Sequence, residues 1–248
     1  MLQTLGIHPI LADITKPETL EALPQVDTVL FSVGMDRTKY DDIRTVYVDG
    51  LKNVLSRLSD QPKHLIYISS TGVYGDFGGQ WVDENSETEP VREGGKACLE
   101  AERLIAASQF ADRSTILRFA GIYGPDRVPT RDLILSKNWK KLSAAGYLNL
   151  IQVDDGARLV THVADQPPTG ETFLVSDGQP SLRKEYYEFI AQQFGIDEIP
   201  WEESEVKPEE SRSGSSKRIS NGKLMERFEF KCDFPDYRSG LKNALDLS

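Results

Sequence analysis

The chain has 248 residues, enough for one α/β domain with a substantial core or for one domain plus a small lobe, and its 39% hydrophobic and 27% charged residues are ordinary for a soluble globular protein. Its 29 Lys and Arg residues against 39 Asp and Glu residues give a net charge of −10, which disfavours nucleic-acid binding because acidic surfaces repel phosphate backbones. The sequence has no long apolar run, no secretory signal pattern and no metal-ligand spacing around its two cysteines, so we predict a cytoplasmic protein with no membrane, nucleic-acid or metal partner.

The first half alternates short apolar runs with amphipathic stretches, a pattern typical of βαβ units. The clearest helix covers 42–58, where apolar residues recur at intervals of three and four. A polar stretch at 76–94 is predicted to be a loop. The expected strands are 7–12, 26–33, 64–69 and 114–119, and the expected helices are 15–24, 42–58 and 95–108.

The second half is less regular. Residues 126–150 show no clean period, and 202–220 is charged and Ser-rich, which predicts a mobile loop. The remaining expected elements are a strand end and helix at 152–163, a strand at 171–175 and a helix at 183–194.

These elements predict an α/β fold with a Rossmann-like, doubly wound parallel sheet. We assign residues 1–177 to the Rossmann-like core, with 126–150 contributing to a substrate lobe. Residues 178–248 are assigned mainly to that C-terminal lobe.

Small and polar residues follow four of the expected strands directly. They are Asp13, the run 32–34, the run 69–71 and the run 120–123. Because ligands in doubly wound sheets lie across the carboxyl ends of the strands, this placement predicts one binding edge. The same residues taken singly are equally well explained as strand ends and turns.

The segment 66–75, IYISSTGVYG, resembles the strand-to-loop signature of extended short-chain dehydrogenases/reductases of the NAD-dependent epimerase/dehydratase type. Two further segments resemble the same family in the same order, LRFAGIYGP at 117–125 and NLIQVDDGA at 149–157. The resemblance runs collinearly from about residue 5 to residue 195. It is closest to the short, atypical members of that family.

The resemblance implies that NAD or NADP is bound. It places Asp13 against the adenine and one serine-bearing strand end against the nicotinamide. The residues that the resemblance assigns to the cofactor are Asp13, Ser32, Val33, Gly34, Ser69, Lys96, Ala120, Gly121, Ile122 and Tyr123.

The family's glycine-rich phosphate loop is not found in this sequence. The family opens with a strand, a G-x-x-G-x-x-G loop and a helix whose N-terminus binds the pyrophosphate. Here the run 2–13 already resembles the family's third strand, so we expect an N-terminally incomplete sheet. An incorrect start codon, a degenerate gene and real divergence are the three explanations, of which we favour the first.

The catalytic pair of the family is also altered. Lys96 stands where the Tyr-x-x-x-Lys pattern has its lysine, but the tyrosine position is Arg92. Arginine does not release its proton at working pH, so Arg92 can bind an anion but cannot act as the general acid. Ser70 and Thr71 remain as hydroxyls for a substrate oxygen, and Tyr74 is interpreted as a packing residue.

The resemblance implies an NAD(P)-dependent epimerase/dehydratase-like or oxidoreductase-like protein acting on a small polar substrate such as a nucleotide sugar. In this hypothesis Ser70, Thr71, Lys96 and Arg92 form the catalytic group. The alternative is a non-catalytic NAD(P)-binding or partner-binding protein on the same fold, which Arg92 favours. A scaffold without a ligand is a third reading. The sequence leaves open the substrate and the choice between NAD and NADP. It also leaves open the oligomeric state, for which a homodimer is one candidate.

Overall fold

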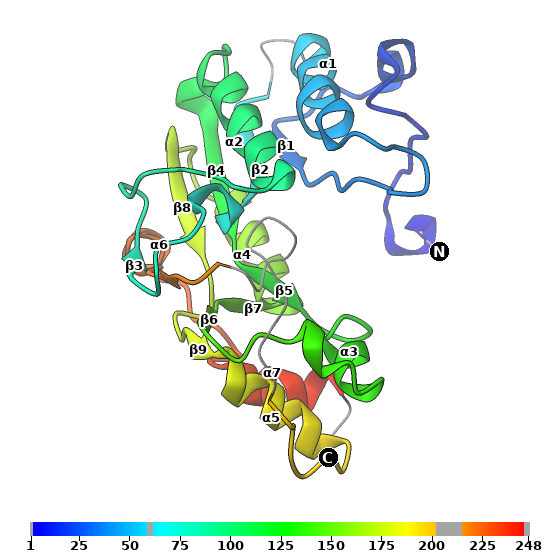
Figure 1. Cartoon of the computed structure of the whole chain (residues 1–248). Helices are drawn as coiled ribbons and strands as arrows, with labels where there is room; N and C mark the ends of the chain where they lie inside the picture. Colours follow the sequence, from blue (N-terminus) through cyan, green and yellow to red (C-terminus); the bar gives the residue numbers. More distant parts are fainter. Residues whose placement is uncertain (1, 59–61, 202–214, 246–248) are drawn as a thin grey trace.

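The computed structural model describes residues 2–58, 62–201 and 215–245. Its centre is a four-stranded parallel sheet in the order β1-β2-β4-β8 (Figure 1). The strands are β1 (Thr28–Phe31), β2 (His64–Ser70), β4 (Ser114–Phe119) and β8 (Glu171–Val175). All six residues of β4 are buried, as expected for a central strand that is covered on both faces.

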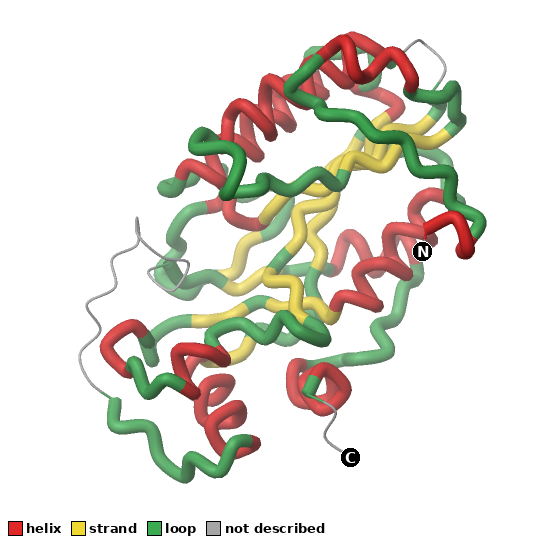
Figure 2. Tube along the Cα trace, turned by 90° about the vertical axis from the view of Figure 1, so that its right-hand side faces the viewer, coloured by secondary structure: helices red, strands yellow, loops and turns green. Residues whose placement is uncertain are grey.

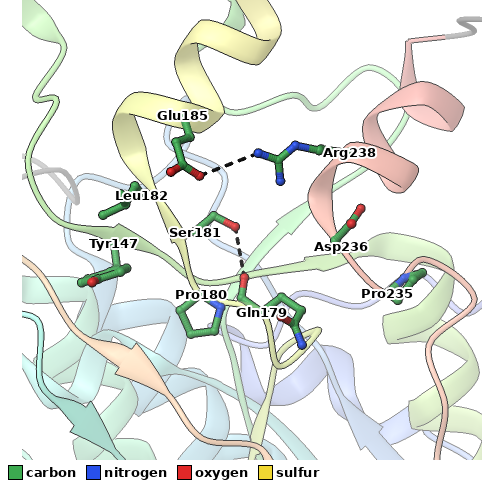
Figure 3. A pocket seen from close by; sticks show the side chains of 9 residues that line it. All are labelled: Tyr147, Gln179, Pro180, Ser181, Leu182, Glu185, Pro235, Asp236 and Arg238. Atoms are coloured by element: carbon green, nitrogen blue, oxygen red, sulfur yellow. Dashed lines mark hydrogen bonds and ion pairs between the residues drawn. The ribbon is translucent and has the colours of Figure 1, made fainter.

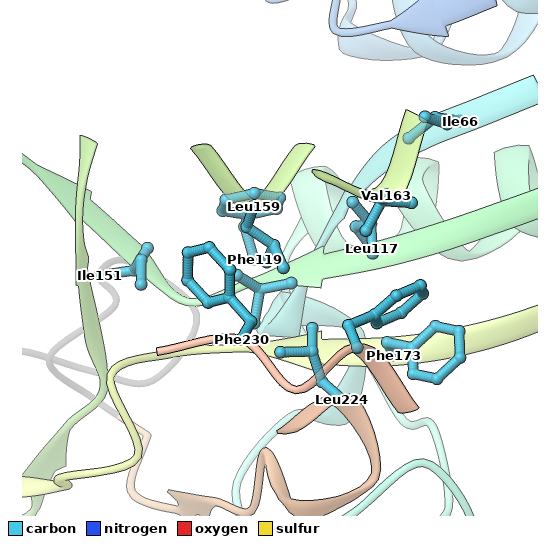
Figure 4. Close-up of a cluster of buried hydrophobic side chains, with 11 residues drawn as sticks. Ile66, Leu117, Phe119, Ile151, Leu159, Val163, Phe173, Leu224 and Phe230 are labelled. Carbon is cyan, nitrogen blue, oxygen red and sulfur yellow. The ribbon is translucent and has the colours of Figure 1, made fainter. Parts of the chain in front are cut away.

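Helices cover both faces of the sheet (Figure 2). On one face, α1 (Leu51–Arg57) and α2 (Glu93–Ala106) pack on side chains such as Leu65 and Ile116. On the other, α4 (Val153–Ala164) and α6 (Gly222–Phe228) enclose a second cluster, part of which is drawn in Figure 4. The predicted doubly wound, Rossmann-like parallel sheet is therefore confirmed.

A third cluster of buried side chains lies beyond the carboxyl ends of the strands, in the lower part of Figure 1. It is built around Tyr123, Tyr186 and Tyr237, which are all fully buried. Its elements are β5 (Gly121–Tyr123), α3 (Arg131–Leu135), β6 (Tyr147–Leu148), β7 (Leu150–Gln152), β9 (Ser181–Leu182), α5 (Arg183–Gln193) and α7 (Tyr237–Ala244). Helix α6 belongs to the segment 178–248 but packs against the sheet. The predicted domain boundary after residue 177 stays a prediction.

Short elements complete the described chain. A two-stranded parallel ladder joins β3 (Trp81–Val82) to β10 (Arg218–Ile219). The helix predicted over 42–58 is observed as a π-helical turn, Thr45–Gly50, that leads into α1. The 3₁₀ segments are Leu2–Leu5, Pro17–Ala22, Thr71–Tyr74, Ala111–Arg113 and Trp139–Lys141.

Two expectations from the sequence are corrected by the structure. Residues 7–12 form no strand, and Leu11 is 99% exposed, so Asp13 does not close a strand. A strand needs a hydrogen-bonded neighbour, and in the described sheet β1 pairs only with β2. The expected loops 76–94 and 202–220 contain the short strands β3 and β10, and residues 202–214 lie outside the described residues.

A buried ion pair joins β4 to α2. The Nε of Arg118 donates to Oε1 of Glu102 at 3.0 Å, and a terminal nitrogen donates to Oε2 at 2.6 Å. The other terminal nitrogen of Arg118 donates to the Tyr74 hydroxyl at 2.6 Å, and Ser69 donates to Glu102 at 2.6 Å. Burial alone lowers the pKa of Arg118, but the hydrogen bonds and charge of Glu102 outweigh it and raise that pKa. Each guanidinium nitrogen of Arg118 and both carboxyl oxygens of Glu102 therefore have a hydrogen-bond partner.

A buried carboxyl group follows β8. Oδ1 of Asp177 accepts from the Gln179 amide at 2.9 Å, whereas Oδ2 is buried without a hydrogen-bond partner among the described residues. Burial is the largest cause that raises the pKa of Asp177 to about 7, and the nearby carboxylates of Asp236 and Asp155 add to it. Asp177 therefore keeps its proton well above the usual pH range of an aspartic acid.

The Glu102→Ala variant tests the buried pair. Removing the carboxylate leaves Arg118 charged and buried, which we expect to lower the free energy of unfolding by about 3–5 kcal/mol. Urea denaturation measures this loss. The matched control is Glu100→Ala on the same helix, where the exposed pair with Arg44 is broken and the expected loss is below about 1 kcal/mol. Equal losses in the two variants would contradict the assigned role.

The Asp177→Asn variant tests the buried carboxyl group. Between the ordinary pKa of 3.8 and the native value of about 7, the folded protein holds a proton that the unfolded chain has released. This group therefore reduces stability progressively as pH rises from about 4 to about 7, and the penalty is constant above that. We expect Asp177→Asn to raise the melting temperature by a few degrees at pH 8 and to leave it unchanged at pH 4. Asp197→Asn, at an exposed position, should change neither value.

Candidate functional site

A cavity of about 250 Å³ lies beyond the carboxyl ends of β2 and β4, between the sheet and the third cluster. Its sheet side is formed by residues 70–72 and 119–121, and its far side by α3, β6 and α5. Nineteen residues line it: Ser70, Thr71, Gly72, Arg92, Phe119, Ala120, Gly121, Pro129, Thr130, Leu133, Lys141, Tyr147, Leu148, Asn149, Leu150, Arg183, Tyr187, Ser215 and Lys217. The structure thus brings Ser70, Thr71, Arg92, Ala120 and Gly121, five of the predicted site residues, to one cavity.

The position of Arg92 follows from a close approach of two backbone segments. A Cβ atom on Gly95, in the first turn of α2, would lie 2.3 Å from the carbonyl oxygen of Gly72. The absence of that atom lets α2 begin directly against the turn that carries Ser70 and Thr71. A terminal nitrogen of Arg92 lies 3.9 Å from the Cβ position of Gly72. The guanidinium of Arg92 therefore stands beside the two hydroxyl residues.

The cavity is cationic. Arg92, Lys141, Arg183 and Lys217 line it, and no Asp or Glu is among its lining residues in the described part of the chain. Arg183 is buried, and its terminal nitrogens donate to the carbonyl oxygens of Ala145, at 2.9 Å, and Ser215. Burial lowers the pKa of Arg183. The wall of the cavity therefore presents cationic side chains, of which Arg183 is bonded to carbonyl oxygens.

The segment 215–219, hereafter the strap, forms one wall of the cavity. The Ser216 carbonyl accepts from the amides of Phe77 and Gly79, each at 3.0 Å. On the opposite side, Asn149 donates to the Lys217 carbonyl at 2.9 Å and accepts from the Ile219 amide at 2.8 Å. Arg218 lies over two aromatic rings, 5.1 Å from the centroid of Trp81 and 5.1 Å from that of Tyr147. The strap is thus fixed to both neighbouring loops.

A second cavity, of about 610 Å³, lies at the end of β1. It brings Asp13 together with Val33 and Gly34, which follow it by 20 residues or more in the sequence. Asp13 accepts hydrogen bonds from Thr15 at 2.7 Å and from the Tyr40 hydroxyl at 3.0 Å, and these bonds lower the pKa of Asp13. A Cβ atom on Gly34 would meet nothing within 4 Å, so this side of the cavity is open to a ligand.

The other predicted site residues are not among those that line these two cavities. Ser32 is exposed directly after β1, and Lys96 is exposed and pairs with Glu93 at 2.8 Å. Ser69 is buried against Glu102. Ile122 packs against the sheet cluster, and Tyr123 is buried in the third cluster, where Gly240 leaves room for its hydroxyl. Their assigned roles stay predictions.

Tyr74 is buried and bonded to Arg118, which confirms its interpretation as a packing residue. Burial is the largest cause that raises the pKa of Tyr74 to about 12. A tyrosine in this state does not lose a proton near neutral pH. It is therefore no substitute for the missing catalytic tyrosine.

A third cavity, of about 530 Å³, lies between the start of α5 and the start of α7 (Figure 3). The ion pair between Glu185 and Arg238 spans it at 3.7 Å. Tyr147, which also borders the cationic cavity, is the one residue that the two share. Charges of both signs line this third cavity, so it shows no preference for one class of ligand.

The described residues also bear on two other classes of site, metal centres and membrane spans. Three or more His, Cys, Asp or Glu residues do not gather at any point there in a way that could hold a metal ion. His64 and His162 instead bond to Thr115 at 2.8 Å and to the Phe228 carbonyl at 2.9 Å. None of the described helices has the length and apolar character needed to cross a membrane.

Sequence reasoning did not identify Lys141, Arg183 and Lys217 as site residues. Lys217 lies at the end of the Ser-rich stretch that was predicted to be a loop, and Arg183 opens an ordinary amphipathic helix. The one available signal was Asn149, which stands in the NLIQVDDGA segment and holds the strap. Its two amide contacts depend on a segment about 70 residues further along the chain.

The model of the 3-beta hydroxysteroid dehydrogenase/isomerase family matches residues 2–201. Among curated proteins, no sequence matches this chain. A Methylobacillus flagellatus structure assigned as an NAD-dependent epimerase/dehydratase is 30% identical, with a TM-score of 0.76, over 97% of this chain and 84% of its own.

Two more distant structures share the fold. The dTDP-glucose 4,6-dehydratase of Bacillus anthracis, in complex with NAD, is 16% identical with a TM-score of 0.78 over 95% of this chain and 77% of its own. RMD from Pseudomonas aeruginosa, complexed with NADPH, is 19% identical with a TM-score of 0.76 over 96% and 88%. The resemblance to short-chain dehydrogenases/reductases of the epimerase/dehydratase type is confirmed, and the chain belongs to the 3-beta hydroxysteroid dehydrogenase/isomerase family.

Proposed function

We propose that this protein is an NAD(P)-dependent oxidoreductase of the epimerase/dehydratase type whose substrate is a small polar molecule with an anionic group, such as a nucleotide sugar. The observation that carries the proposal is the cationic cavity. Four cationic side chains line it, with no carboxylate among the lining residues that the structure describes, in a chain whose net charge is −10. A diphosphate satisfies such a group of donors, because charge-assisted hydrogen bonds to phosphate oxygens are strong.

The same charges argue against a purely apolar substrate. A steroid skeleton carries no anionic group to complement the four cationic side chains of the cavity, and covering charged groups with hydrocarbon is unfavourable. A substrate that carries phosphate or carboxylate oxygens complements their charge. Substrate polarity is therefore the property in which this member differs from what the family's name suggests.

The second cavity suits the adenosine end of a dinucleotide. Asp13 presents a carboxylate beside the open space at Gly34, and Val33 lies between them. In the cationic cavity, Ala120 and Gly121 would face the nicotinamide, with Ser70 and Thr71 hydrogen-bonding a substrate oxygen. The bound cofactor supplies a two-electron acceptor or donor. The complexes of similar folds with NAD and NADPH support both cofactors equally.

A second candidate function is non-catalytic NAD(P) or partner binding. Arg92 favours it, since this residue occupies the position of the family's proton-donating tyrosine and arginine keeps its proton. Lys96 pairs with Glu93 on the exposed side of α2. In this alternative the cationic cavity binds an anionic ligand without converting it.

Anion binding is tested with uridine diphosphate as the probe. We expect saturable binding by calorimetry, weakened by added salt because the contacts are electrostatic. Arg92→Gln should raise the dissociation constant by about tenfold, the equivalent of one charge-assisted hydrogen bond. The control is Arg44→Gln, at an exposed arginine that pairs with Glu100 of α2, and it should leave the dissociation constant unchanged. No binding by the unmodified chain would contradict an anion site.

Cofactor use and turnover separate the two candidate functions. A cofactor at a hundredfold excess over its dissociation constant stabilises the fold by about 2.7 kcal/mol, so a melting curve with NAD or NADP reports binding directly. Turnover of sugar nucleotides, followed at the absorbance of the reduced nicotinamide, would support the enzyme. Stabilisation without turnover, together with activity gained in Arg92→Tyr, would support the non-catalytic alternative instead.

A further inference from the structure

Lys217 is the cationic residue of the strap that lines the cavity. Its backbone is held by Asn149 on one side, and the preceding Ser216 is held by the 77–79 loop on the other. Its Nζ donates to the Gly75 carbonyl at 2.8 Å. Among the described residues this is the only hydrogen bond that the amine makes, which leaves its remaining positions for a molecule in the cavity.

The anchor of this amine belongs to the turn that carries the two hydroxyl residues. Gly75 directly follows the 3₁₀ turn Thr71–Tyr74, which Ser70 caps by accepting from the Gly72 amide at 3.1 Å. Gly75 has a φ of 63°, and a Cβ atom there would lie 2.2 Å from the Glu89 carbonyl oxygen. The carbonyl that holds Lys217 is therefore fixed in place relative to Ser70 and Thr71.

Burial and the neighbouring cations favour the neutral form of the Lys217 amine. Burial is the largest cause that lowers the pKa of Lys217 to about 8, and Arg92 at the start of α2 and Arg183 on α5 add to the effect. Asp76, next to Gly75 on the turn, opposes it. Lys141 is the other cation that lines the cavity. Near pH 8 the amine can both accept and donate a proton, which neither arginine can do.

We propose that Nζ of Lys217 exchanges the proton with the reacting oxygen of the substrate, in the role that the family gives to its tyrosine. This inference rests on the proposed function. In the oxidative direction the substrate O–H bond breaks and its proton passes to the neutral amine. A bound oxidised nicotinamide would accept the hydride from the adjacent C–H bond, so that a C=O bond forms as the proton reaches Lys217. In reduction the ammonium of Lys217 returns the proton, and the charge of Arg92 stabilises the developing oxyanion.

The first arm of the test needs no turnover. Trace labelling of amines with acetic anhydride across a pH series, read by mass spectrometry on the full chain, gives the titration midpoint of Lys217. We expect a midpoint near pH 8, and a higher one in Arg92→Gln because a neighbouring cation is removed. Arg44→Gln is the control and should leave the midpoint in place. A midpoint at the usual lysine value of about 10.4 would overturn the inference whatever the protein does.

The second arm measures turnover by Lys217→Met after its fold and its stabilisation by cofactor have been verified. Loss of kcat by a hundredfold or more at similar KM supports proton exchange, as does a pH profile of oxidation that rises with an apparent pKa near 8 and moves upward in Arg92→Gln. A raised KM with unchanged kcat would show that Lys217 only binds the anion, which overturns the inference but not the proposed function. Absence of turnover by the unmodified chain would overturn both.

Discussion

The buried pair of Arg118 and Glu102 is the interaction on which the site depends. It crosses from the middle of the sheet to α2, and its side partners, Ser69 and Tyr74, flank the turn that carries Ser70 and Thr71. Burying two charges costs free energy unless their polar atoms have hydrogen-bond partners. Here the guanidinium of Arg118 and the carboxyl group of Glu102 are joined by two parallel hydrogen bonds. The pair thus holds the end of β2, the turn and the helix that begins at Arg92 in one fixed arrangement.

The charges of the molecule are unevenly distributed around this arrangement. Acidic residues outnumber basic ones over the whole chain, yet the cavity that faces the carboxyl ends of β2 and β4 is lined by cations. In such a site an anionic ligand enters a local field opposite to the average field of the surface. Arg92, which the resemblance predicts to be at the family's tyrosine position, belongs to this field. Its presence changes the chemistry of one position while strengthening the electrostatics of the whole cavity.

The sheet and its main helices could be predicted because their signals are local. The strand 114–119 and the helix 95–108 are read from apolar periodicity, and the structure has them as β4 and α2 with small shifts at the ends. Residues 7–12 carry a similar apolar pattern but find no strand partner in the described sheet. An apolar pattern shows that a segment favours a strand, but it does not show whether a neighbouring strand is available for hydrogen bonding.

The site was predictable only where the family resemblance covers it. Ser70, Thr71 and Arg92 come from segments that resemble the signature and the catalytic pair, and they do share a cavity. Lys217 lies outside every recognised segment. Its place depends on contacts with Gly75 and Asn149, and no local pattern around residue 217 encodes them. Long-range pairing of this kind is a property of the folded chain.

The strap has a consequence for the order in which the protein assembles. Its bond from Lys217 to Gly75 joins residues 142 positions apart, so this wall of the cavity depends on a contact between segments far apart in the sequence. Contacts of such separation form late, because closing a long loop costs entropy before the contact is gained. During synthesis the sheet strands β1, β2 and β4 emerge well before the strap. These strands can therefore pair before the strap is made, whereas the cavity is complete only after the strap has joined it.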